Sequence, residues 1–147
     1  MKSIIAIVTV FIFIGCQSDK PKNFKFYKAL KGKDIALLRL METENNFYGQ
    51  FEIKYGGAGK DSGEVRGVKI GDTLKGKYDY RSYGGNKKWA PFVLLRRGEI
   101  FKWGNGVVTT YMNIPFIIPE TLKFDDSDFQ FELIDSTTAK KLDLATE

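Results

Sequence analysis

Apolar and polar residues alternate along much of this chain, as they do in β-strands that bury one side and expose the other. The segment Phe47–Tyr55 places its aromatic and aliphatic side chains on one side and Gln50, Glu52 and Lys54 on the other. The segment Thr73–Ser82 repeats this pattern. A period of two over such lengths does not fit an amphipathic helix, so both segments are predicted to be strands with one solvent-facing side.

Shorter runs of the same type occur before, between and after these two segments. They are bounded by turn-forming residues such as Gly32, the Gly71-Asp72 pair and Gly98, which favour hairpin connections. The segment Ile114–Pro119 is apolar but bracketed by prolines, so we expect a covered loop or a short edge segment there. The further predicted strands are Phe24–Leu30, Ile35–Met41, Glu64–Ile70, Ala90–Arg96, Glu99–Trp103, Val107–Met112 and one around Phe129–Leu133.

The spacing of the turns predicts an all-β fold. Turns recur roughly every 8–12 residues, and no segment beyond residue 23 has a convincing helical period. The connections are too short for crossover helices, so neighbouring strands should be antiparallel. We therefore expect about eight strands in residues 24–135, arranged as a meander that curls into a small barrel or a two-layer sandwich. The polar tail 136–147 is expected to fray or to form a short terminal helix.

The N-terminal residues have the composition of a secretory signal. A lysine is followed by an apolar run of eleven residues, Ile4–Ile14. Because a membrane-spanning helix needs about 20 apolar residues, this run favours a removable signal peptide, residues 1–15, over a transmembrane helix. The alternative is a buried N-terminal element of a cytosolic domain. The polar segment Gln17–Asn23 argues against it, because a core element is not normally joined to its domain by such a tether.

The single cysteine lies directly at the end of this signal. The sequence Phe13-Ile14-Gly15-Cys16 resembles a bacterial lipobox, with phenylalanine in place of the commoner leucine. The resemblance implies cleavage after Gly15, a diacylglycerol on the Cys16 sulfur and a further fatty acid such as palmitate. Two or more acyl chains hold a protein stably on a membrane. We therefore expect a lipoprotein of the bacterial cell envelope, on the outer rather than the inner membrane, tethered by residues 16–23. The sequence leaves open whether it faces the periplasm or the cell exterior.

Two absences in the composition exclude whole classes of chemistry. The chain of 147 residues has no histidine, which removes Ser-His-Asp and Cys-His catalytic arrangements and histidine metal sites. One cysteine forms neither an intrachain disulfide nor a multi-cysteine metal site. The sequence therefore singles out no catalytic residue, no cofactor and no metal ligand. A catalytic carboxylate pair stays open, since a sequence does not give the separation of such groups in space; the candidates are Glu52, Asp61, Glu64 and Asp79.

Two further segments invite functional interpretations that their details disfavour. Gly56–Ser62 is similar to a phosphate-binding loop, but Asp61 stands where such a loop needs Ser or Thr after its lysine, so we interpret it as a flexible hairpin loop. Asp125–Asp128 offers carboxylates to calcium but lacks the glycine and the spacing of an EF-hand. An acidic surface turn before a strand is the better interpretation.

Several turns resemble those of a family of small, uncharacterised lipoproteins from Bacteroidetes-type bacteria. The similarity spans about Phe24 to Gly106 and implies an exported, lipid-anchored β-protein without implying a particular chemistry. The chain departs from the family pattern at Tyr83–Lys88 and at Trp89-Ala90, so we expect any family function of that loop to be altered here. The matching motifs are Gly32–Ile35, Lys60–Gly67, the Arg97-Gly98 turn and Gly71–Tyr78, of which the Gly-Asp-Thr-Leu turn is the most specific.

Basic residues are concentrated in the first two thirds of the chain. Lys20–Lys102 holds 19 lysines and arginines against nine acidic residues, whereas Trp103–Glu147 holds three against eight. Because an exported protein seldom meets nucleic acid, the expected partner is an anionic envelope glycan or another protein. An aromatic and basic loop is the candidate ligand surface, since a ring can stack on a sugar and a lysine can bind an anion. The alternative is a solvated loop with one packed tryptophan. The residues concerned are Tyr83, Lys87, Lys88 and Trp89.

Three functional hypotheses follow from these patterns. The first is a lipid-anchored, non-enzymatic binding or interaction module, because the chain is rich in strands and lacks a catalytic motif. The second is a carboxylate-based hydrolase, which needs two facing acids, at least one of them buried with a raised pKa. The third is a structural accessory subunit of an envelope complex, which needs an exposed apolar patch larger than about a few hundred Å².

Overall fold

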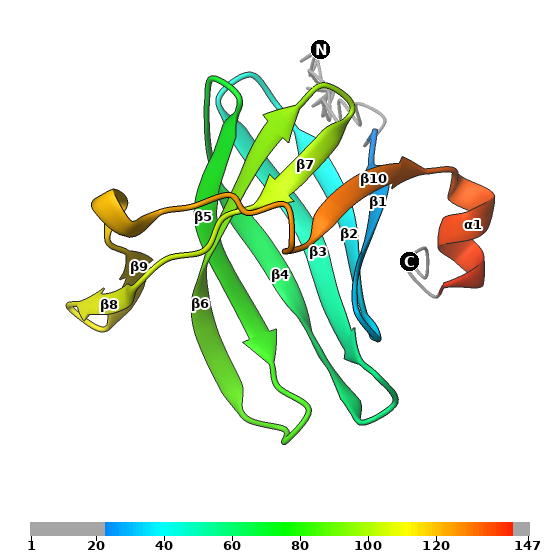
Figure 1. Ribbon diagram of the computed structural model, residues 1–147, viewed down its shortest axis with the longest axis horizontal. Coiled ribbons are helices and arrows are strands. Elements are labelled where there is room, and N and C mark those ends of the chain that lie inside the picture. The colour runs from blue at the N-terminus through cyan, green and yellow to red at the C-terminus, as the bar shows by residue number, and fades with distance from the viewer. Residues whose placement is uncertain (1–22, 143–147) are drawn as a thin grey trace, which may run out of the picture.

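Within the described residues, 23–142, eight strands close into an antiparallel barrel (Figure 1). In this computed structural model, the predicted signal peptide, Cys16 and all but the last residue of the predicted tether lie outside the described residues. The all-β prediction is confirmed, and of the two expected architectures the barrel is the one found. The barrel strands, in chain order, are β1 (Lys25–Lys31), β2 (Asp34–Glu42), β3 (Asn46–Tyr55), β4 (Gly59–Ile70), β5 (Thr73–Arg81), β6 (Lys87–Arg97), β7 (Ile100–Trp103) and β10 (Gln130–Ile134).

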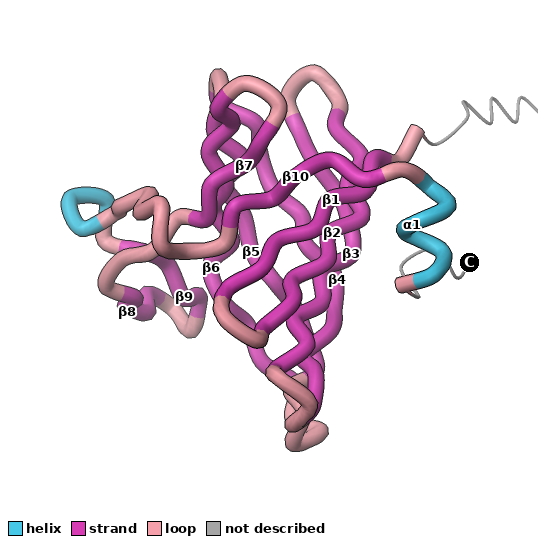
Figure 2. The backbone as a smooth tube through the Cα atoms, turned by 45° about the vertical axis from the view of Figure 1, so that its right-hand side comes forward, coloured by secondary structure: helices cyan, strands magenta, loops and turns pink. Residues whose placement is uncertain are grey.

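The closing strand of the barrel comes from the far end of the chain. From β1 to β7, each strand pairs with the next in sequence order, always antiparallel. After β7 the chain leaves the barrel and returns as β10, which lies between β7 and β1 (Figure 2). The register joins Phe131 to Phe101 on one side and Leu133 to Tyr27 on the other. Closure removes the sheet edges that would otherwise pair with other chains.

The barrel has two ends, which we call the upper and the lower mouth after their positions in Figure 1. The upper mouth comprises the start of β1 and the β2–β3, β4–β5 and β6–β7 turns. The lower mouth comprises the β1–β2, β3–β4 and β5–β6 connections. Because the chain enters β1 at its upper end, the predicted tether joins the barrel at the upper mouth.

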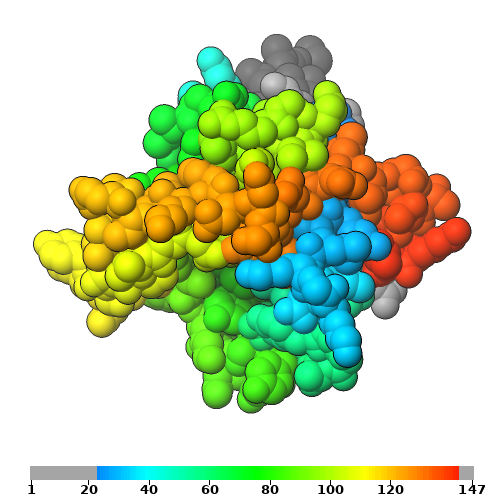
Figure 3. All heavy atoms as spheres, viewed as in Figure 1, coloured from blue at the N-terminus to red at the C-terminus, as the bar shows by residue number. Residues whose placement is uncertain are grey.

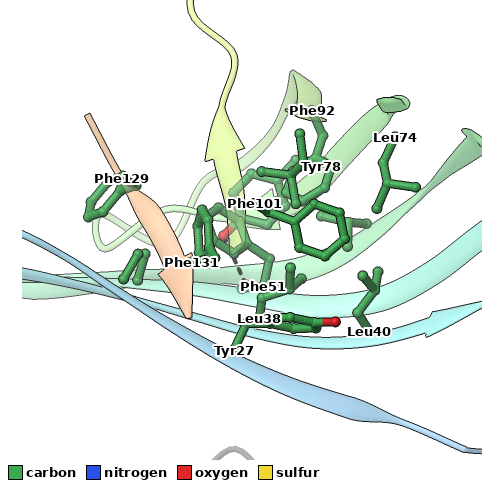
Figure 4. Close-up of a cluster of buried hydrophobic side chains, with 14 of the residues drawn as sticks. Tyr27, Leu38, Leu40, Phe51, Leu74, Tyr78, Phe92, Phe101, Phe129 and Phe131 are labelled. Atoms are coloured by element: carbon green, nitrogen blue, oxygen red, sulfur yellow. Dashed lines mark hydrogen bonds between the residues drawn. The ribbon is translucent and has the colours of Figure 1, made fainter. Parts of the chain in front are cut away.

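Aromatic rings fill the middle of the barrel (Figure 4). The centre of the Phe51 ring lies 4.9 Å from that of Tyr78 and 5.4 Å from those of Phe92 and Trp103. Edge-on and stacked contacts of this kind add stability beyond that of the buried area. The Tyr78 hydroxyl donates a hydrogen bond to the carbonyl oxygen of Phe51 at 3.1 Å, so this buried polar group is satisfied. Side chains therefore occupy the space that a wider barrel leaves for a ligand.

Two facing glycines allow the sheet to curl tightly. Gly67 of β4 pairs with Gly76 of β5, both on the inward side of the barrel. A Cβ on Gly76 would lie 2.1 Å from the carbonyl oxygen of Arg66, and one on Gly67 would lie 2.2 Å from that of Lys75. No side chain fits at either position, so the close approach of the two strands depends on glycine.

A separate hairpin projects from the side of the barrel (Figure 1). It pairs β8 (Val108–Tyr111) with β9 (Ile114–Ile117), and the two turn residues between them have positive φ, as a tight hairpin turn requires. The predicted strand Val107–Met112 is confirmed. Of the two expectations for Ile114–Pro119, the edge segment is the one found, but the segment is largely exposed rather than covered. A short 3-10 helix, η1 (Pro119–Thr121), follows.

The last described element is a short helix that packs on the outside of the barrel. Helix α1 (Ser136–Lys141) begins at Asp135, whose side chain accepts a hydrogen bond from the backbone N–H of Thr138. Ala139 is fully buried against Leu37 of β2. The short terminal helix expected for the tail is therefore present. No helix within residues 23–142 combines the length and the apolar character needed to cross a bilayer.

Candidate functional site

The structure separates the four residues that the sequence predicted as a ligand surface. Tyr83 lies in the β5–β6 loop at the lower mouth, and Lys87, Lys88 and Trp89 begin β6. Because side chains alternate along a strand, Lys88 is in phase with the buried Phe92 and points to the inside, whereas Lys87 and Trp89 point outward. The predicted surface is thus divided between the outer wall of the barrel and its lower mouth.

Trp89 is the centre of an outward-facing surface on β5 and β6. Its side chain is 50% exposed although it stands on a regular strand. The Lys77 ammonium lies 4.7 Å from the centre of the Trp89 ring, in a cation–π contact that limits the motion of both side chains. The strand register places Asp79 opposite Trp89 and Arg81 opposite Lys87. Aromatic and charged groups therefore meet on one rigid surface.

This surface continues across β4 to β3, and we call it the Trp89 face. Its charged members are four basic and two acidic residues, so the surface carries a net positive charge. Tyr48 supplies a second exposed ring, and its hydroxyl lies 3.4 Å from a carboxylate oxygen of Glu64. Such a surface can stack on a sugar ring and pair with an acidic group at the same time. The members of the Trp89 face are Tyr48, Glu64, Arg66, Lys77, Asp79, Arg81, Lys87 and Trp89.

Tyr83 belongs instead to a cluster with Tyr55 and Asp61 at the lower mouth. One oxygen of Asp61 accepts from the backbone N–H of Tyr83 at 2.8 Å, and the other accepts from the Tyr55 hydroxyl at 2.9 Å. Burial, followed by the hydrogen bond and charge of Asp61, raises the pKa of the Tyr55 hydroxyl above its ordinary value of 10. Both carboxylate oxygens are thus engaged in holding the β5–β6 loop.

A second polar cluster lies at the upper mouth, and we call it the upper-mouth ion cluster: Glu42, Lys69 and Arg96. One oxygen of Glu42 accepts from Arg96 at 2.5 Å, and the other lies 3.3 Å from the Lys69 ammonium. Arg96 also stacks on Phe101, with its guanidinium 4.2 Å from the ring centre. Burial alone would raise the pKa of Glu42, but the hydrogen bond and charge of Arg96, and then those of Lys69, hold that pKa below its ordinary value.

The sequence reasoning missed the upper-mouth ion cluster, although the alternation contains its signal. Glu42 is in phase with the buried Leu40 of β2, and Arg96 is in phase with the buried Leu94 of β6. A charged residue at the end of a strand, on the side that the strand buries, is typical of the mouth of a barrel. That signal becomes useful only once a barrel is assumed.

The connection between β9 and β10 crosses the front of the barrel (Figure 3). Its acidic turn, Asp125–Asp128, holds it in place through side-chain contacts. The buried Asp128 accepts from the Lys31 ammonium at 3.0 Å and from the side-chain amide of Asn105. Asp126 pairs with a lysine of β7. Within residues 23–142, no three acidic, cysteine or histidine side chains gather in a way that could hold a metal ion. The segment is an acidic turn before β10 that is exposed at residues 125–127 but has Asp128 buried.

Two partly buried carboxylates of the barrel strands, Glu42 and Glu52, are engaged with cations at separate places. Glu42 lies in the upper-mouth ion cluster, whereas Glu52 lies on the outer side of β3, 3.4 Å from Lys54 and 2.8 Å from Lys60. These two carboxylates do not form the facing pair that a hydrolase needs.

No family model, curated protein or solved structure matches the chain. The resemblance to Bacteroidetes-type lipoproteins therefore stays a prediction.

Proposed function

We propose that the protein is a lipid-anchored, non-enzymatic binding module of the bacterial envelope that holds an anionic glycan on the Trp89 face. The observation that carries the proposal is Trp89 itself, a half-exposed indole fixed on a strand and covered on one side by Lys77. A ring held in this way loses little conformational freedom when a sugar stacks on it. The adjacent cations supply the attraction for the acidic groups of the glycan.

The distribution of charge supports an anionic ligand. Lys20–Lys102 carries 19 basic and nine acidic residues, and the Trp89 face lies within this part of the chain. Arg66 of β4 is paired with Lys77, and Arg81 of β5 lies two residues beyond Asp79, the strand partner of Trp89. Arginine presents a planar pair of donors that matches a carboxylate or a phosphate.

The packed interior of the barrel favours binding on the surface. Phe51, Phe92 and Trp103 occupy the middle of the barrel and contact one another through their rings. A ligand would have to displace these rings to enter, at the expense of the core contacts that stabilise the fold. The outer wall and the two mouths are therefore the places where a ligand can bind.

The lipid anchor is tested by replacing Cys16 with serine. The expected result is loss of the fatty acid from the intact mass and release of the protein from the membrane fraction. Ser18→Ala, which leaves the lipobox unchanged, is the matched control and should stay acylated. Equal membrane association and equal mass for Cys16→Ser and wild type would contradict the anchor. Protease treatment of intact cells then distinguishes a surface protein, which is digested, from a periplasmic one.

Glycan binding is tested by calorimetric titration of the protein with polygalacturonate, with neutral dextran as the uncharged control. Trp89→Ala should weaken binding to polygalacturonate by about fivefold to tenfold, because the stacking ring and the cation–π contact are lost together. Tyr111→Ala removes an exposed ring of the hairpin, outside the Trp89 face, and should bind as wild type does. Equal affinities for all three proteins, or binding of dextran with the same affinity, would refute the proposal.

The hairpin supplies the observation that favours a second candidate function, an accessory subunit of an envelope complex. From Gly106 to Pro119 the chain has no charged residue, and Met112 at the tip of the hairpin is 79% exposed. Unprotected, uncharged edge strands are suited to pairing with another protein. A photo-crosslinking residue at Thr110 should then give one discrete adduct in cells, whereas the same residue at Lys33 should give none. The absence of an adduct at Thr110 would exclude this role.

A further inference from the structure

The upper mouth contains a cavity that is separate from the Trp89 face. Its volume is about 390 Å³, and charged and polar side chains dominate its lining. We propose that this cavity binds a phosphate-type anion. The lining residues on which the proposal depends are Asn23, Lys25, Glu42, Lys69 and Arg96.

The lining carries more positive than negative charge. Glu42 is the one carboxylate among the lining residues, and it is shared between Arg96 at 2.5 Å and Lys69 at 3.3 Å. Lys25 forms no ion pair with another residue of the described range 23–142. Three cations therefore surround one carboxylate, and Asn23 adds an amide. A dianion such as phosphate neutralises the two charges that Glu42 leaves unbalanced.

Two of the three cations, Lys69 and Arg96, are held in place before an anion arrives, whereas Lys25 is exposed. Lys69 and Arg96 are only 32% and 28% exposed, and Arg96 rests on the Phe101 ring. Lys25 is in phase with the buried Tyr27 and therefore points to the inner side of β1. Charges at partly buried positions interact more strongly with a ligand than fully solvated ones do. A site whose donors are fixed in advance also needs less ordering when the ligand binds.

Two kinds of ligand carry the phosphate group that the cavity would bind. One is a free phosphate solute, and the other is the headgroup of a phospholipid. Asn23 at the edge of the cavity is separated from Cys16 by seven peptide units, which span at most about 25 Å when extended. If Cys16 carries the lipid of the proposed function, the upper mouth stays within that distance of the bilayer surface. A headgroup can then reach the cavity, while the cavity itself does not depend on the anchor.

Calorimetric titration of the detergent-purified full chain tests the site with two probes, inorganic phosphate and short-chain phosphatidylglycerol, and with short-chain phosphatidylcholine as the zwitterionic control. Lys25→Glu should weaken the binding of phosphate by about tenfold or more, because a charge-assisted contact is replaced by repulsion. Lys33→Glu makes the same change of net charge at the lower mouth and should bind as wild type does. Lys25→Gln, which avoids the added negative charge, should show a smaller loss of the same sign.

The outcomes of the titration distinguish a free anion, a lipid headgroup and the absence of a site. Binding of phosphate alone assigns the site to a free anion, and tighter binding of phosphatidylglycerol than of either phosphate or phosphatidylcholine assigns it to a lipid headgroup. Binding of neither probe, or equal losses for Lys25→Glu and Lys33→Glu, overturns the proposal. Trp89→Ala is expected to leave these titrations unchanged, so failure of this site and failure of the glycan-binding face are distinguishable.

Discussion

Replacement of Glu42 by glutamine is expected to destabilise the barrel and, at the same time, to strengthen anion binding at the upper mouth. The Glu42 side chain is 14% exposed and contacts both Arg96 and Lys69. Glutamine keeps the size of the side chain and one acceptor oxygen but loses the charge. The two cations then remain close together without a counter-ion, which disfavours the folded state and attracts an external anion.

The expected loss in the free energy of unfolding depends on how exposed Arg96 and Lys69 are. Removing one member of a fully buried ion pair costs about 3–5 kcal/mol. Because Arg96 and Lys69 are 28% and 32% exposed, water screens part of the loss, and we expect the free energy of unfolding to fall by about 1.5–3 kcal/mol. For a domain of this length one kcal/mol corresponds to roughly 4 °C in Tm, so the expected decrease in Tm is roughly 6–12 °C.

The effect should depend on pH with a defined sign. The pKa of Glu42 in the folded protein lies below its ordinary value near 4.5, so the stabilisation is fully present above that value and is lost as the pH falls through the lowered pKa. The difference in Tm between wild type and Glu42→Gln should therefore be constant at neutral pH and shrink toward zero in strong acid.

Thermal melts followed by circular dichroism between about pH 3 and pH 7 measure this difference. Glu44→Gln, a substitution of an exposed acid in the adjacent turn, is the control and should melt as wild type does. A change in Tm of less than about 2 °C at pH 7, or equal changes for both variants, would refute a stabilising role for the upper-mouth ion cluster. Partial unfolding would weaken phosphate binding, not tighten it. A lower Tm together with tighter phosphate binding would therefore show that both effects come from the loss of the Glu42 charge.

Three further substitutions test the packing of the fold. Phe51→Ala removes the ring at the centre of the aromatic core and should lower the free energy of unfolding in urea by about 3–5 kcal/mol. Gly76→Ala places a Cβ 2.1 Å from a backbone oxygen and should reduce the yield of folded protein in size-exclusion chromatography, whereas Gly71→Ala, in an open turn, should leave the yield closer to wild type. Ala139→Asp buries a carboxylate against Leu37, so α1 should lose its protection in hydrogen exchange while the barrel strands keep theirs.

The strands that alternation predicted best are those whose two sides differ most. The predicted segments Phe47–Tyr55 and Thr73–Ser82 agree with β3 and β5 to within one residue at each end, because one side of each strand faces the core and the other faces water. The start of β4 was predicted too late, at Glu64 instead of Gly59. Its first residues have no apolar periodicity, and their strand conformation comes from pairing with β3, which the local sequence does not encode.

The candidate sites depend more heavily on contacts between distant segments. Alternation already implies that Lys88 points opposite to Trp89, but the contact between Lys77 and Trp89 follows from the register of β5 and β6. The upper-mouth ion cluster brings together β2, β4 and β6, which are neighbours across the barrel only because β10 closes it. Closure is a property of the whole chain, so the cluster could not be predicted from any one segment.

The positions of the two proposed sites relative to the tether are consistent with different roles. Trp89 is the third residue of β6, close to the lower mouth, whereas the predicted tether joins the barrel at the upper mouth. An anchor at Cys16 would therefore allow the cationic cavity to face the bilayer while Trp89 faces away from it, toward the polymers that surround the membrane. The opposite orientation would bring a surface rich in lysine, arginine and exposed rings against the lipid and leave it inaccessible to a glycan. If the protein is anchored and binds a glycan as proposed, the orientation with the upper mouth toward the membrane serves both sites, because it leaves Trp89 accessible and brings the cavity of Lys25, Lys69 and Arg96 within reach of a phospholipid headgroup.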